Sequence, residues 1–238
     1  MTTQINLGEI SVDVVKKDIK NIHLSVHPPA GRVRISAPQR MDLDTIRVFA
    51  ITKLGWIKKQ QQKMHEQERE SPRECLDRES HYLWGKRYLL KVELRDTASF
   101  VSLRHNKLVL HIHPDMSEER KQAILAEWYR EQLKEAVLPL IAKWEPLMGV
   151  KVAKFFVQRM KTKWGSCNHR SGNIRLNTEL AKKLPECLEY VVVHELAHLL
   201  EPSHNSRFIA LMDQFMPLWR GRREELNRSP LGHENWEY

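Results

Sequence analysis

The chain of 238 residues is poor in cysteine and has no long apolar run. Its three cysteines, Cys75, Cys167 and Cys187, are odd in number and widely spaced, so they indicate neither a disulfide framework nor a C-x-x-C zinc site. No hydrophobic run approaches the length of a membrane span. The first residues have neither the basic region nor the apolar core of a signal peptide. We therefore expect a cytoplasmic protein with reduced thiols and no membrane partner.

The sequence also lacks the patterns that are typical of nucleotide and nucleic-acid binding. It has no P-loop, and no row of aromatic residues interleaved with basic ones. Its net charge of +9 nevertheless favours an anionic partner, although a modest excess of lysine and arginine is equally typical of a solvated surface. Nucleic acid is therefore a candidate partner that the sequence does not favour. The sequence gives no indication of the oligomeric state.

Hydrophobic periodicity predicts an α+β protein. Apolar and polar residues alternate in short strands over residues 5–37, and helical spacing follows over 42–69. The remaining segments are expected as strands over 82–94, a hairpin across His105-Asn106, a helix over 118–144, strands over 150–160 and 172–177, and helices over 180–200 and 206–216. We expect three parts: a β-rich N-terminal part with one long helix (1–115), a catalytic domain (116–225) and a C-terminal tail (226–238).

The most informative segment reads His194-Glu195-Leu196-Ala197-His198, an H-E-x-x-H motif. Two histidines four residues apart lie on one face of a helix, so both imidazoles can bind a single tetrahedral zinc ion. The glutamate between them can accept a proton from the attacking water. Apolar residues flank the motif on both sides, which predicts a buried helix. Burial of two histidines and a glutamate would be costly without a metal.

A third zinc ligand is expected just beyond this helix. Pro202 should end the helix near Glu201, and the chain then presents His204 six residues after His198. Glu201 is the rival ligand, and Glu224 and Glu225 are more distant candidates. We favour His204. Three protein ligands leave one position for water, which is typical of a catalytic zinc, with one ion per chain.

Two other segments carry side chains that could bind a metal or act as a nucleophile. His111 and His113 alternate on one strand and could chelate a metal, but no third ligand is near, so a half-exposed strand face is favoured. Cys167 is a candidate nucleophile or ligand, although a small buried packing residue is the favoured interpretation.

A basic segment precedes the predicted strand 173–177. Arg159, Lys161 and Lys163 share one face if this segment is extended, and three like charges repel each other unless an anion is near. Trp164 then begins a tight turn with Gly165. The expected substrate-binding residues are Arg159, Lys161, Lys163, Trp164, Arg175 and Asn177. The strand 174–177 is expected to pair with an extended peptide, as edge strands do.

Four pieces of the chain together resemble the YgjP-like family of metal-dependent hydrolases, which is related to the SprT-like zincins. They are Y-L-W-G at 82–85 with Tyr88, K-W-G-S-C at 163–167, I-R-L-N at 174–177, and H-E-L-A-H at 194–198 with His204 and Phe208. The resemblance implies a smaller β-rich N-terminal part followed by a zincin-like metallopeptidase domain. It also implies His194, His198 and His204 as zinc ligands and Glu195 as catalytic acid and base.

Three functions follow, in order of preference. The first is a zinc-dependent hydrolase, a metallopeptidase that cleaves peptide bonds with a zinc-activated water. The second is a metal-dependent pyrophosphatase of UTP-like nucleoside triphosphates, because the basic row could hold phosphate and some members of the family carry that label. The third is a non-enzymatic nucleic-acid-binding module, which leaves the histidine motif unexplained. The sequence indicates no residue that would stabilise an oxyanion.

Overall fold

The computed structural model describes residues 2–27, 31–66, 75–160 and 163–228. The chain divides into two compact units, one up to Pro72 and one from Arg73 to Ser229. The boundary falls well before the expected one at residue 115. The reason is that the strands preceding residue 115 share a hydrophobic core with the long helix that follows them, through Leu125.

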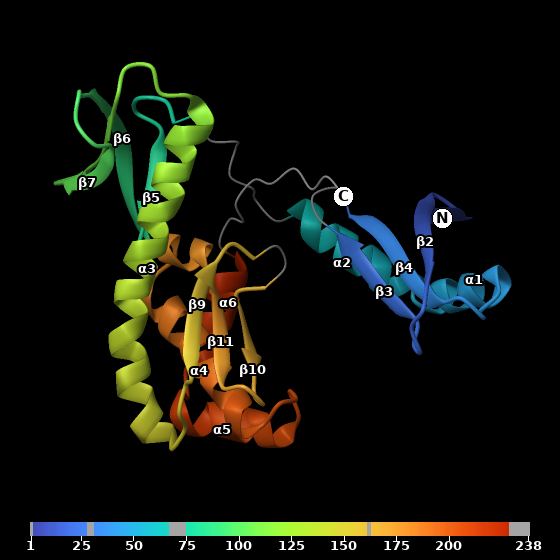
Figure 1. The fold of residues 1–238 in the computed structure, drawn as a ribbon. Coiled ribbons are helices and arrows are strands. Elements are labelled where there is room, and N and C mark those ends of the chain that lie inside the picture. Colours follow the sequence, from blue (N-terminus) through green and yellow to red (C-terminus); the bar gives the residue numbers. More distant parts are fainter. Residues whose placement is uncertain (1, 28–30, 67–74, 161–162, 229–238) are drawn as a thin grey trace. The chain divides into compact units, whose positions relative to one another are not determined.

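The first unit is a four-stranded sheet with two helices (Figure 1). The strands β1 (Thr2–Leu7), β2 (Ile10–Lys17), β4 (Arg32–Pro38) and β3 (His23–His27) follow one another in that order, with β2 and β4 parallel. Alternate residues of the strands face a core that also takes in residues of the helices, such as Ile46 and Ile57. The expected single helix is interrupted at Lys53, the C-cap of the first of the two helices, which are α1 (Leu43–Thr52) and α2 (Leu54–Glu66).

A second four-stranded sheet opens the second unit. Its strands are ordered β5 (Ser80–Leu83), β6 (Lys86–Leu94), β8 (Lys107–Ile112) and β7 (Phe100–Arg104). The hairpin across His105-Asn106 is confirmed, because β7 pairs antiparallel with β8 and His105 takes the left-handed conformation of a tight turn. Gly85 packs against Leu184, which places the β5–β6 turn on the segment that leads into the motif helix.

The long helix α3 (Glu118–Met148) connects the two halves of this unit. It begins at the N-cap Ser117 and ends at Gly149 with φ of 66°. Leu125, near its start, lies in the core of the second sheet, whereas Leu133 and Trp144 lie in the largest core of the molecule. The helix is four residues longer than predicted and remains continuous through Pro139 and Pro146.

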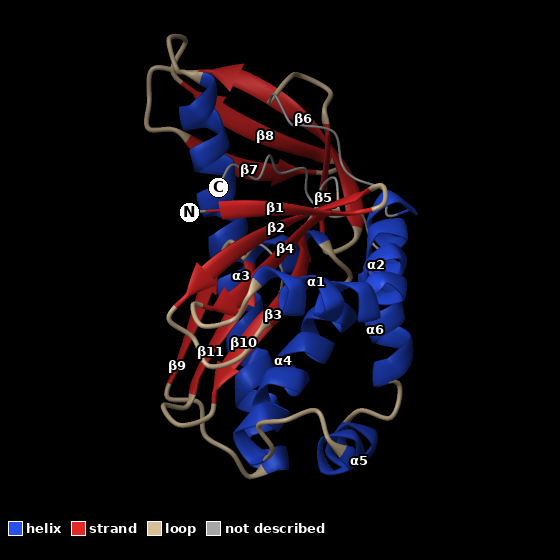
Figure 2. Cartoon of the chain, turned by 90° about the vertical axis from the view of Figure 1, so that its right-hand side faces the viewer, coloured by secondary structure: helices blue, strands red, loops and turns tan. Residues whose placement is uncertain are grey.

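A three-stranded sheet and three helices complete the second unit (Figure 2). The sheet order is β10 (Gly165–Asn168), β11 (Asn173–Asn177) and β9 (Lys154–Gln158), and a 3-10 helix, Thr178–Lys182, follows. The α-helices are α4 (Pro185–Leu200), α5 (Ser206–Phe215) and α6 (Trp219–Arg228). Strand β10 and helix α6 were not predicted. The expected helix over 180–200 is divided before Pro185, which occupies the first turn of α4.

Helix α4 is the centre of the largest core. It packs against β10 and β11 on one side and against α3, α5 and α6 on others. Its buried residues are Cys187, Leu188, Tyr190, Val191, Val192, Val193, Glu195, Leu196 and Ala197. Within the described segments, no helix combines the length and apolar character needed to cross a bilayer.

Candidate metal centre

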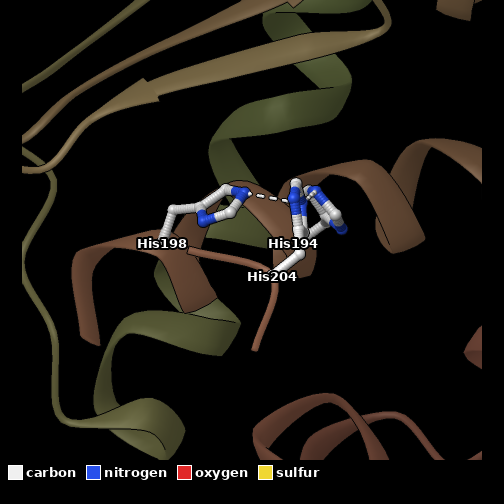
Figure 3. Close-up of side chains that lie close together, drawn as sticks. All are labelled: His194, His198 and His204. Atoms are coloured by element: carbon white, nitrogen blue, oxygen red, sulfur yellow. Dashed lines mark hydrogen bonds between the residues drawn. The ribbon is translucent and has the colours of Figure 1, made fainter. Parts of the chain in front are cut away.

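Three histidine side chains converge at the end of helix α4. His194 and His198 lie one turn apart on the helix, which ends at Leu200 with Glu201 as its C-cap. The chain then turns through Pro202 and brings His204 back toward the other two rings, directly before α5 (Figure 3). The helix end and the reversal of the chain agree with the predicted break at the proline.

The distances between the three imidazoles suit a metal ion. The Nε2 atom of His204 is 3.1 Å from that of His194 and 3.1 Å from that of His198. One Nε2 proton can be directed at only one of these two neighbours, so hydrogen bonds alone do not account for the cluster. Ligand nitrogens about 2.0–2.1 Å from a tetrahedral zinc ion are roughly 3.3 Å from one another. Both distances from His204 are therefore close to the spacing of ligands in such a site, and all three ligand atoms lie within 4.8 Å of one another.

Neighbouring groups orient the rings. The Nδ1 atom of His198 lies 3.1 Å from the carbonyl oxygen of Glu201, to which it donates when Nε2 is kept as the lone-pair nitrogen. Phe208, which is 1% exposed, packs against all three imidazoles with ring centroids 4.6 to 4.9 Å apart. This apolar contact limits rotation of the rings and excludes water from one side of the cluster.

Burial favours the neutral form of His194 and His198, which is the form that binds a metal. Burial lowers the pKa of His194 to about 3, and the charges of His198, His204 and Arg223 act in the same direction. Burial also lowers the pKa of His198. Neutral imidazoles with convergent lone pairs leave a cation as the natural partner.

Glu195 lies beside this group and is only 4% exposed. Burial raises the pKa of its carboxyl group to about 8, while the positive charge of Lys163 opposes that shift. Its Oε2 atom is buried and has no hydrogen-bond partner among the described residues. Gly165 of β10 lies directly against the carboxylate: a β-carbon there would come within 2.9 Å of both Cγ and Cδ of Glu195. A glycine is thus required at this position for the carboxylate to occupy its place.

A pocket of about 470 Å³ opens onto the histidines and Glu195. Of the predicted substrate-binding residues, Lys163 and Trp164 line it. Arg159 and Arg175 do not: Arg159 lies close enough to Glu179 for its charge to act on that carboxylate, and the guanidinium of Arg175 stacks 5.6 Å from the ring of Phe156. The remaining prediction, Lys161, falls outside the described residues.

Asn177, also predicted to bind substrate, holds the loop that precedes β10. Its side chain is buried and donates hydrogen bonds to the carbonyl oxygens of Met160, at 2.8 Å, and Lys163, at 2.9 Å. Its backbone N–H donates to the carbonyl of Trp164. Asn177 therefore positions Trp164 and Gly165, and does not itself line the pocket.

The rival metal ligands lie apart from the three nitrogens. The carboxylate of Glu201 accepts hydrogen bonds from the backbone and hydroxyl of Ser203. Glu224 and Glu225 form ion pairs with Arg228 and Arg222 of α6, respectively. Cys167 lines the pocket, and burial followed by the charge of Glu195 raises the pKa of its thiol to about 11, so a thiolate is disfavoured there.

Two expectations about strands were wrong. His111 was expected on a half-exposed strand face but is fully buried, because it is covered by Phe100, whose ring stacks on it at 4.2 Å. The strand 174–177 was expected to pair with a peptide, but β11 is the central strand of its sheet, paired with β9 and β10.

Sequence reasoning missed Tyr190 and Arg223, which also line the pocket. Tyr190 lies one turn before His194 on α4, so its position followed from the same spacing that identified the motif. Arg223 lies between Trp219 and Leu226 at helical spacing, a pattern that was not recognised in an otherwise highly charged segment.

Comparison with known proteins places the chain in a family. The YgjP-like family, described as a metallopeptidase domain, matches residues 20–229, and the chain belongs to it. The family implies a metal and a hydrolytic activity.

Two solved structures are similar to parts of the chain. The metallopeptidase zymogen abylysin of Pyrococcus abyssi is 19% identical, with a TM-score of 0.33 over 43% of this chain and 99% of that one. The zymogen jannalysin of Methanocaldococcus jannaschii is 18% identical, with a TM-score of 0.30 over 41% and 92%. No curated protein matches the chain.

Proposed function

We propose that the protein is a zincin-type peptidase in which His194, His198 and His204 hold one zinc ion per chain. The observation that carries this proposal is the convergence of three imidazole Nε2 atoms, two of them 3.1 Å from the third. Imidazole nitrogens are ligands that zinc prefers, and three of them leave a position for water. A zinc ion bound there would polarise the scissile carbonyl and increase the acidity of the attacking water.

Glu195 is proposed as the catalytic acid and base. Its unpartnered Oε2 would accept a proton from the attacking water and then deliver it to the nitrogen of the leaving amine. Gly165 supports this role, because it leaves the space in which the carboxylate lies. A group that must first accept and later donate a proton works best when its pKa is close to the working pH.

The substrate is proposed to bind as an extended peptide along β10. Among the described strands, β10 pairs only with β11, and its residues Gly165, Ser166 and Cys167 line the pocket. An extended peptide can therefore add to the exposed edge of this strand through main-chain hydrogen bonds. This would direct its carbonyl groups toward the proposed metal centre.

The alternative functions have less support. The nucleotide hypothesis depended on a basic row, and of its two described members Lys163 lines the pocket whereas Arg159 lies near Glu179. The binding-module hypothesis again leaves the three convergent histidines unexplained.

Metal content measured by mass spectrometry tests the ligand set. We expect about one zinc per chain in the wild type and in the control variant His113→Ala, which removes an exposed histidine outside the cluster. His204→Ala should lose most of the zinc. Equal zinc in His204→Ala and wild type would contradict the three-histidine site.

Peptide hydrolysis by Glu195→Gln tests the mechanism. The variant should keep its zinc and lose turnover of a mixed peptide library, because glutamine cannot accept the proton. Substantial turnover by the zinc-loaded variant would contradict the proposed role of Glu195.

A further inference from the structure

The four arginines of helix α6 differ in their partners. Arg220, Arg222 and Arg228 pair with Asp213, Glu225 and Glu224, respectively. Arg223 has no carboxylate within ion-pair distance in the part of the chain that the structure describes. Among the described residues that line the metal pocket, it is also the only arginine.

Helical geometry explains why Arg223 faces the pocket. Trp219 and Leu226 are the buried residues of α6, and Arg223 is four residues after the first and three before the second, so it lies on the same face. Trp219 stacks with Tyr190 of α4, which fixes that face against the motif helix. The charge of Arg223 acts on both Tyr190 and His194, so the guanidinium lies near the proposed metal ligands.

The described lining of the pocket offers Arg223 no counterion within ion-pair distance. That lining contains one acidic side chain, Glu195, and it is not among the carboxylates that pair with an arginine of α6. A guanidinium at the wall of a concave site is a strong binding group for an anion, and its planar fork of N–H donors fits a carboxylate with two parallel hydrogen bonds.

We propose that Arg223 is a specificity-determining residue that binds a carboxylate of the peptide substrate. This inference rests on the proposed peptidase function and names the substrate class of the same site. The carboxylate has two sources in a peptide, its C-terminus and an acidic side chain close to the scissile bond. The shared chemistry is a carboxylate held by Arg223 while the peptide backbone lies at the histidines.

Calorimetric binding to the zinc-loaded full-length Glu195→Gln protein tests the proposal without requiring catalysis. Three versions of one short acetylated peptide are compared: a free C-terminal carboxylate, its C-terminal amide, and the amide with Glu in place of an internal Gln. Each is titrated into the Glu195→Gln parent and into the parent carrying Arg223→Gln, Arg223→Lys or the control Arg228→Gln. Arg228 is already paired with Glu224, so it reports on the loss of a positive charge from the same helix.

We expect at least one carboxylate peptide to bind the parent more tightly than the neutral amide. Arg223→Gln should weaken that binding about 10- to 100-fold and leave the neutral amide unchanged, because a charge-assisted hydrogen bond is lost. Arg223→Lys should restore it in part, since lysine keeps the charge and loses the fork. Preference for the free C-terminus or for the internal Glu identifies the source of the carboxylate.

Other outcomes would overturn the proposal. Equal binding of acidic and neutral peptides to the parent would mean that no carboxylate site exists. An equal loss of affinity for all three peptides in Arg223→Gln would indicate a structural role for Arg223. An unchanged preference for the carboxylate peptides in that variant would indicate that the carboxylate binds the metal directly. Tighter binding of pyrophosphate than of every peptide would favour a phosphate site. Failure of the wild type to cleave any peptide would instead contradict the peptidase function, and the binding result would remain interpretable.

Discussion

Histidines lie close to other polar groups in two regions of the second unit, and their partners differ: those of the β5–β8 sheet are buried, whereas His194 and His198 are half-buried and His204 is exposed. In the β5–β8 sheet, the Nε2 atom of His111 is 3.0 Å from the hydroxyl of Ser102, and its Nδ1 atom is 3.4 Å from Glu93. His81 likewise lies 3.3 Å from Glu79 and 3.5 Å from the hydroxyl of Tyr129. The carboxylate contacts are electrostatic and lack good hydrogen-bond geometry. At the end of α4, by contrast, the polar neighbours of the histidine Nε2 atoms are other histidines.

This difference separates a structural histidine from a metal ligand better than burial does. A carboxylate or hydroxyl supplies the complementary charge or hydrogen bond that a buried imidazole needs, so no further partner is required. When the Nε2 atoms of several imidazoles face one another, lone pair meets lone pair or proton meets proton, and the rings do not satisfy one another. The comparison predicts that a metal stabilises the α4 region and has no effect on the sheet.

The largest expected effect comes from removing a convergent histidine. His198→Ala should lose bound zinc, and a chelator should then no longer change its thermal midpoint, whereas it should lower that of the wild type. Zinc at about 1,000 times its dissociation constant contributes roughly 4 kcal/mol to folding. Differential scanning calorimetry with and without chelator measures this contribution.

Ser102→Ala is the matched change in the other region. It removes one hydrogen bond to His111 and should lower the free energy of unfolding by about 1 kcal/mol, with full zinc content and peptidase activity. Loss of zinc or activity in Ser102→Ala would break the distinction between the two regions.

A smaller change should separate catalysis from metal binding within the α4 region. Gly165→Ala forces the carboxylate of Glu195 to move but leaves the three histidines in place. We expect unchanged zinc and a fall in kcat of roughly 100-fold, because displacements of about 1 Å at a reacting group have effects of this size. Gly221→Ala is the control, since a β-carbon there meets nothing within 4 Å. Equal kcat for both variants would show that Gly165 does not position Glu195.

Local patterns predicted the parts of the fold and site that depend on neighbouring residues in sequence. The helix of His194 and His198, its end before Pro202 and the return of His204 all follow from spacing and from the chemistry of proline. The family resemblance was confirmed over residues 20–229.

Features that depend on tertiary packing were not predicted. The central position of β11 is set by the unforeseen strand β10. The role of Asn177 in holding the loop before β10 depends on residues up to 17 positions away. Arg223 was missed because a run rich in arginine and glutamate is typical of a solvated helix, and only its packing through Trp219 and Leu226 turns one arginine toward the pocket.

The smallest expected effect is a pH dependence of stability that belongs to the sheet. Burial lowers the pKa of His111 below its usual 6.5, the charges of Arg95 and Arg104 add to this, and Glu93 opposes it. The unfolded chain therefore takes up a proton at His111 more readily than the folded protein does. Its stabilising contribution is complete above about pH 6.5 and decreases as the pH falls toward the folded-state pKa.

Urea unfolding between pH 5 and 8 measures this dependence. His111→Gln should flatten the decline on acidification, whereas His113→Gln, at an exposed position, should leave it as in the wild type. The slope of the free energy of unfolding against pH should differ between wild type and His111→Gln by the same amount with and without zinc, because the partners of His111 are protein groups. In the α4 cluster, protons compete with the metal for the same nitrogens, so any pH dependence arising there must change with zinc. A zinc-dependent slope at His111 would mean that the two regions are coupled.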